Sequence, residues 1–141
     1  MRFMMLMIPA GYETAAPGTV PDDVERFAAM MEYNKALLEA GVLITCDGLH
    51  PPSMGARVSF PSGGPVVTDG PFAEAKEVLG GYWMIDVASR EAAIEWASKC
   101  PASADEVIEI RQVQEINDFP ADVQALTDGY DVMQTTAQRL G

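Results

Sequence analysis

The sequence predicts an α+β fold of the ferredoxin-like type, a split βαβ arrangement with an inserted β-hairpin that dimerises into an α/β barrel. Strand-like and helix-like patterns alternate along the chain, and Gly/Pro-rich turns separate them. The resulting order is β-α-β, a hairpin, then β-α-β, which is the order of this fold with one insertion. We expect the strands at 3–8, 42–49, 56–60, 66–69, 81–87 and 106–116.

The first helix is expected between Pro21 and Gly41. Pro21 suits a first helical position, acidic residues follow it, and Gly41 is a plausible stop. Apolar residues recur at helical spacing and predict one buried stripe, made of Val24, Phe27, Met30, Met31, Leu37 and Leu38. Asn34 falls inside this stripe, so its amide must find a partner or cost about 1–3 kcal/mol.

Residues 3–8 are apolar at every position, which predicts a strand covered on both faces. The helices of this fold cover only one face of the sheet. A second subunit on the other face is the simplest cover, and we therefore expect a homodimer.

The remaining elements follow from alternation and capping. Residues 56–60 alternate as a half-buried strand should, and they pair with 66–69 across a Gly/Pro turn. In 81–87, Trp83 and Ile85 share one face. Ser89 is a good N-cap for a second helix that runs to Cys100. The domain is expected over 1–116, and 117–141 reads as a polar C-terminal extension with a short helix after Pro120.

Composition narrows the classes of partner. The chain has 21 acidic against 9 basic residues and a net charge of −12, which disfavours nucleic acid and anionic membranes. Cys46 and Cys100 lie far apart with no CxxC pattern, so free buried thiols are expected and no metal site. The apolar N-terminal stretch is too short for a signal peptide or a membrane span. These observations predict a soluble cytoplasmic protein.

The stretch from Val67 to Tyr82 combines an Asp-Gly-Pro-Phe turn, a cluster of charged residues and a double glycine. It resembles the signature of the DGPF branch of the YCII-related family. Further similar segments occur in order over about 1–116, namely Met30 to Asn34, Ala40 to Leu43, Gly48 to Pro51, Gly80 to Trp83 and Glu91 to Ala97.

The resemblance implies a dimeric α/β barrel of ferredoxin-like subunits whose function is largely unassigned. Some members are associated with sigma factors, which implies a regulatory role, and one branch removes chloride from a chlorinated aromatic. In the YCII branch a histidine on the first helix and an aspartate are proposed as an acid–base pair. This chain has Tyr33 and Asn34 at that place, and its only histidine is His50.

His50 is the candidate general base, because imidazole titrates near neutral pH. Asp47 and Asp69 are the candidate carboxylates that would orient it. An ideal strand directs Asp47 and His50 to opposite faces, so that pair needs a bulge or a turn at Gly48. The alternative is a surface-loop histidine before a proline.

Two further groups are candidate ligand contacts. Asp69, Glu74, Lys76 and Glu77 would line a polar pocket in which Lys76 anchors a carboxylate or phenolate; the alternative is a capped, solvated turn. Tyr33 and Asn34 would project into the cleft between helix and sheet, or Asn34 would cap a loose backbone group. Arg57 with Glu109, and Arg111 with Asp86, are expected as cross-strand ion pairs.

Three functions remain open at this point. The first is a small-molecule-binding or regulatory accessory module with a polar cleft. The second is a cofactor-free lyase or isomerase that acts on a small cyclic or aromatic substrate. The third is a protein-interaction module with an acidic surface, linked to sigma-factor regulation. None of them calls for a cofactor or a metal.

Overall fold

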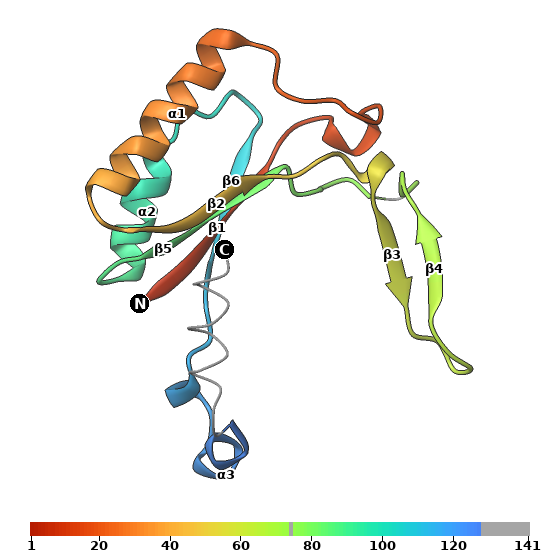
Figure 1. The fold of residues 1–141 in the computed structure, drawn as a ribbon, viewed down its shortest axis with the longest axis vertical. Coiled ribbons are helices and arrows are strands. Elements are labelled where there is room, and N and C mark those ends of the chain that lie inside the picture. Colours follow the sequence, from red (N-terminus) through yellow and green to blue (C-terminus); the bar gives the residue numbers. More distant parts are fainter. Residues whose placement is uncertain (74, 128–141) are drawn as a thin grey trace.

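The computed structural model describes residues 1–73 and 75–127 and shows the predicted α+β ferredoxin-like fold (Figure 1). Its main sheet has the strand order β2-β5-β1-β6, and every pairing in it is antiparallel. The strands are β1 Arg2–Ile8, β2 Leu43–Gly48, β3 Ala56–Ser59, β4 Val66–Asp69, β5 Gly81–Asp86 and β6 Val107–Gln112. The helices are α1 Val24–Glu39, α2 Arg90–Ser98 and α3 Ala121–Gln124.

The hydrophobic core lies between the sheet and the pair of helices α1 and α2, which cover the same face (Figure 1). Alternation places every second side chain of β1 and β5 on this face. The fully or nearly fully buried side chains include Phe3, Met5, Met7, Leu37, Trp83, Ile85 and Ala93. Trp83 and Ile85, expected to share one face of 81–87, do share the buried face. The predicted Ser89 cap is confirmed, since its hydroxyl accepts from the Ala92 N–H at 3.1 Å.

Helix α1 departs from the sequence prediction at its start and in its buried face. It begins at Val24, because the Asp23 side chain accepts from the Arg26 N–H at 3.1 Å and caps the first turn. Its buried residues are Tyr33 and Leu37. The expected stripe was wrong in four of its members, which are exposed: Val24, Phe27, Met31 and Leu38. Apolar residues occupy two neighbouring flanks of α1, and only one of them meets the sheet.

Strands β3 and β4 form a separate two-stranded sheet that projects from the body of the molecule (Figure 1). All of their residues are exposed. The expectation of a half-buried strand at 56–60 was therefore wrong, because every residue of β3 and β4 is exposed. The segment that contains it leaves the main sheet after β2 and returns at β5. There the Leu49 N–H donates to the Gly80 carbonyl at 3.0 Å.

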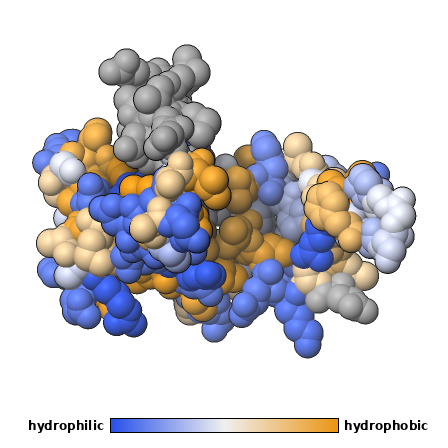
Figure 2. Space-filling view, turned by 90° about the horizontal axis from the view of Figure 1, so that it is seen from below, coloured by the Kyte–Doolittle hydropathy of each residue, from blue (hydrophilic) through white to orange (hydrophobic). Residues whose placement is uncertain are grey.

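The face of the main sheet opposite the helices has an apolar centre. Met4, Leu6 and Ile8 of β1 lie half-buried on it, beside Tyr82 and Met84 of β5. Figure 2 shows hydrophobic side chains gathered in the hollow between the body and the projecting hairpin. The expected cross-strand ion pairs are absent from the described residues, since Arg111 binds Glu109 and Asp86 binds the amino group of Met1.

Beyond β6 the chain forms a 3₁₀ turn at Ile116–Asp118 and the short helix α3 after Pro120. No helix in 1–73 or 75–127 has the length and apolar character needed to cross a membrane.

Candidate ligand pocket

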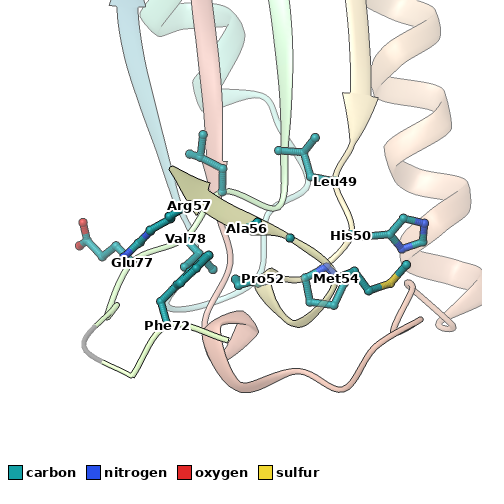
Figure 3. Close-up of a pocket in the computed structure, with 12 residues that line it drawn as sticks. Leu49, His50, Pro52, Met54, Ala56, Arg57, Phe72, Glu77 and Val78 are labelled. Carbon is teal, nitrogen blue, oxygen red and sulfur yellow. The ribbon is translucent and has the colours of Figure 1, made fainter. Parts of the chain in front are cut away.

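A pocket of about 370 Å³ lies at the base of the projecting hairpin (Figure 3). Two segments of the insertion between β2 and β5 build it, one before the hairpin and one after it. Its lining is mostly apolar, with His50, Arg57 and Glu77 as the charged or titratable members. The apolar and small residues are Leu49, Pro51, Pro52, Met54, Gly55, Ala56, Phe72, Val78 and Leu79.

A close backbone approach joins the two walls of the pocket. The Gly70 N–H donates to the Gly55 carbonyl at 2.9 Å. A Cβ atom on Gly70 would lie 1.7 Å from the carbonyl oxygen of Pro52, so only glycine fits. The peptide between Gly70 and Pro71 is cis. The Gly70–Gly55 hydrogen bond and the close approach to Pro52 bring the turn before Phe72 against the Pro52 segment, and both Phe72 and Pro52 line the pocket.

A second set of contacts ties the first wall to the loop after β1. The Tyr12 hydroxyl donates to the Leu49 carbonyl at 2.6 Å, and the Ser53 hydroxyl donates to the Ala15 carbonyl at 2.9 Å. Burial raises the pKa of the Tyr12 phenol, which keeps it protonated as a donor. The first wall is thus held by hydrogen bonds to the loop after β1, outside the pocket, and by the Gly70–Gly55 hydrogen bond to the other wall.

Arg57 and Phe72 form one end of the pocket. The guanidinium carbon of Arg57 lies 4.0 Å from the centroid of the Phe72 ring, a cation–π contact. In the hairpin, Arg57 of β3 pairs with Thr68 of β4, which brings Arg57 close to the turn that carries Phe72.

His50 lines the pocket at its other end, with Pro52 and Ala56 between it and Arg57 (Figure 3). Its imidazole points away from Arg57 and Phe72 in this view. It is exposed, and no side chain of the described residues forms a hydrogen bond or ion pair with it. The structure does not bring it together with either candidate carboxylate.

Asp47 and Asp69 lie outside the pocket lining. Asp47 is on β2 opposite Tyr82 of β5, and its Oδ2 accepts from the Tyr82 hydroxyl at 2.9 Å. This hydrogen bond raises the pKa of the Tyr82 phenol. Asp69 ends β4 opposite Ala56 and immediately precedes the Gly70 contact.

Tyr33 and Asn34 serve the core of the fold. The Tyr33 hydroxyl donates to the Trp96 carbonyl of α2 at 2.8 Å, and burial raises the pKa of this phenol well above its ordinary value. The Asn34 Oδ1 accepts from the Trp83 indole N–H at 2.7 Å. The Tyr33 and Trp83 rings meet edge to face with centroids 5.7 Å apart. These contacts place both side chains away from the pocket.

Of the charged signature residues, Lys76 is exposed and lies beside the lining residue Glu77. Glu74 lies outside the described residues. Sequence reasoning thus anticipated His50 and Glu77 at the pocket but placed Arg57 elsewhere and gave Phe72 no role. The hairpin register was the signal available, because pairing 56–59 with 66–69 brings Arg57 next to the turn before Phe72.

The cysteines lie apart from the pocket and are both free and partly buried. Burial and the nearby Glu106 carboxylate raise the pKa of the Cys100 thiol to about 11. Within the described residues, no group of three or more His, Cys, Asp or Glu side chains is arranged to hold a metal ion.

Comparison with known proteins shows the family of this chain. An uncharacterized protein of Rhizobium meliloti (strain 1021) is 42% identical over 60 residues, which are 43% of this chain and 48% of that protein. The match thus spans about half the length of that relative. The family model for the YCII-related domain matches residues 1–117. The chain therefore belongs to the YCII-related family.

Proposed function

We propose that the protein is a small-molecule-binding module, regulatory or accessory in role, whose ligand site is the pocket at the base of the β3–β4 hairpin. The observation that carries this proposal is a mostly apolar pocket with a few polar groups at its ends. Ligand sites of small molecules have this composition and a volume of about 300–1,000 Å³. The glycine contact and the Tyr12 and Ser53 hydrogen bonds fix both walls before any ligand arrives.

A fragment screen by saturation-transfer NMR tests the proposal. Val78 lines the pocket, whereas Val58 lies on the exposed hairpin outside the lining, so the two valines form a matched pair. Fragments that bind the native protein should lose binding in Val78→Glu and keep it in Val58→Glu. Hits that survive in Val78→Glu would place binding elsewhere and count against this pocket.

The alternative function, a cofactor-free lyase or isomerase, depends on His50, which lines the pocket. A carboxylate that orients the imidazole would have to move toward it, since Asp47 is bound by Tyr82. Once a turned-over substrate is found, His50→Ala should abolish the reaction. Full turnover by this variant would eliminate His50 as the base.

A homodimer forms part of the same proposal. The half-buried apolar residues of the open sheet face would be covered by the equivalent face of a second copy. Sedimentation should give a dimer at micromolar concentration. Leu6→Glu should give monomers, because the new carboxylate lies on that face opposite Glu109. Leu38→Glu, on an exposed flank of α1, is the control. A stable native monomer would refute the dimer.

A protein-interaction role linked to sigma-factor regulation remains the second alternative. Apolar side chains exposed on α1 support it, among them Val24 and Leu38, which are 80% and 65% exposed. Truncation after Ile116 tests the predicted boundary between the domain at 1–116 and the extension at 117–141. Retained binding of a captured partner would exclude the extension as the contact surface. A cytoplasmic location belongs to these proposals and is checked by cell fractionation.

A further inference from the structure

Most basic side chains in 1–73 and 75–127 form ion pairs with carboxylates. Every described Lys and Arg except Arg57 and Lys76 forms an ion pair: Arg2 with Glu115, Arg26 with Glu106, Lys35 with Glu39, Arg90 with Glu91, Lys99 with Glu95 and Arg111 with Glu109. In a chain with 21 acidic and 9 basic residues, a Lys or Arg that pairs with no carboxylate of the described residues is the exception. Both exceptions lie at the pocket, Arg57 in its lining and Lys76 next to it.

From this distribution we propose that the pocket binds a small carboxylate with an apolar body, and that Arg57 is the residue that receives the carboxylate. This inference rests on the proposed ligand-binding function and adds the chemical class of the ligand.

Arg57 is prepared for this role by its contact with Phe72. The ring covers the guanidinium at 4.0 Å, which restricts its position without using any of its N–H donors. A guanidinium held in this way can donate two parallel hydrogen bonds to a carboxylate. Lys76 has no such support within the described residues, and it is not part of the lining.

The rest of the lining selects the body and the charge of the ligand. The walls between Arg57 and His50 are formed by Pro52, Met54 and Val78, which accept an apolar group. Glu77 stands in the same lining and repels excess negative charge. A singly charged carboxylate fits this arrangement better than a doubly charged phosphate.

Two matched pairs of compounds test the class: benzoate with benzamide, and hexanoate with hexanamide. Each pair shares an apolar body and differs in charge. Titrations are followed by the backbone amide shifts of Met54, Gly55 and Phe72. The carboxylate of at least one pair should bind the native protein about tenfold more tightly than its amide, the usual gain from a charge-assisted hydrogen bond.

Substitutions then assign the contact to Arg57. Arg57→Gln should lower carboxylate affinity about tenfold, to that of the amide, and leave amide affinity within about twofold. Arg57→Lys should retain part of the preference, because it keeps the charge but loses the planar fork. Lys76→Gln and Arg90→Gln are controls and should keep the native preference. Amide spectra that match the native protein outside the hairpin confirm that each variant folds.

The outcomes separate the two proposals. If no compound shifts the pocket amides at millimolar concentration, the pocket is not a ligand site and both proposals fall. If carboxylate and amide bind equally and Arg57→Gln changes neither, the pocket proposal survives and the carboxylate inference is wrong. Tighter binding of phenyl phosphate than of benzoate also overturns the carboxylate class, and loss of the preference in Lys76→Gln alone overturns the role of Arg57.

Discussion

The substitution Gly70→Ala tests how the pocket walls are joined. The added methyl group would lie 1.7 Å from the Pro52 carbonyl oxygen and 2.6 Å from its carbon, whereas real Cβ atoms keep at least 3.0 Å from such atoms. Both neighbours belong to the backbone, so no side chain can rotate away. The Pro52 turn and the base of the hairpin must therefore separate.

The expected loss in the free energy of unfolding is about 1.5–4.5 kcal/mol, the sum of two terms. Forced separation of well-packed groups costs about 1–3 kcal/mol. Breaking the hydrogen bond from the Gly70 N–H to the Gly55 carbonyl, 2.9 Å long in the native protein, adds about 0.5–1.5 kcal/mol. The hairpin can also detach as a unit, and the free energy that holds it in place then limits the loss.

Urea unfolding followed by tryptophan fluorescence measures this loss, because Trp83 is buried in the core. With a slope of about 2 kcal/mol per molar urea, the midpoint should fall by about 1–2 M. Gly55→Ala is the matched control. Its Cβ would lie 3.5 Å from the same Pro52 oxygen, and its φ of −111° suits alanine, so it should be neutral or slightly stabilising. Equal stability of the two variants would show that the reasoning from the close approach is wrong.

Three other predictions concern the core and the titrating groups. Asn34→Ala should cost about 1–3 kcal/mol in urea unfolding, since the buried Trp83 N–H loses its acceptor; a loss below 0.5 kcal/mol, on the order of an ordinary surface change, contradicts this. The pKa of Cys100 is about 11 in the folded protein against an ordinary 9.0. The contribution of this thiol to the free energy of unfolding is therefore complete below pH 9 and is lost as pH rises toward 11. For this partly buried thiol we expect the free energy of unfolding to fall by about 1–2 kcal/mol over this pH range in the native protein and not in Cys100→Ala. Parallel curves of unfolding free energy against pH for the two proteins would refute this. The hydrogen bond from Arg2 lowers the pKa of the Glu115 carboxyl below 4.5, so the contribution of this carboxylate to stability is present above that pH and is lost as pH falls through the folded pKa. The stability of Glu115→Gln should therefore fall less steeply with decreasing pH than that of the native protein, and an equally steep fall argues against the pair.

The alternation of patterns was sufficient to predict the order of strands and helices, because apolar residues recur with a different period in a strand than in a helix. Trp83 and Ile85 were assigned to one face of a strand on this basis, and both are buried in the core. Spacing alone did not resolve α1, since apolar residues such as Phe27 and Leu38 cover a flank that no element in the described structure meets. Burial depends on what packs against a helix, and a single helix does not contain that information.

The candidate site was harder to predict because it depends on contacts between segments. The motif around Gly70 drew attention to the right turn, yet the reason for its glycine is the Pro52 carbonyl, 18 positions earlier in the chain. Arg57 read as one member of a surface ion pair until the hairpin placed it over Phe72. Asn34 and Tyr33 were interpreted as ligand contacts. Their hydrogen bonds to Trp83 and Trp96 show that polar side chains beside a core also provide hydrogen-bond partners for its polar groups.

All residues that line the pocket fall between the end of β2 and the start of β5, and the two ends of this insertion meet at the Leu49–Gly80 hydrogen bond. One contiguous stretch thus carries the whole proposed ligand site, and the four-stranded sheet with its two long helices carries the hydrophobic core. The core residues Phe3, Met5 and Ile85 all lie outside this insertion. Related proteins with this scaffold can therefore bind different ligands by changing lining residues of this one insertion, provided that the contact of Gly70 with the Pro52 carbonyl is kept.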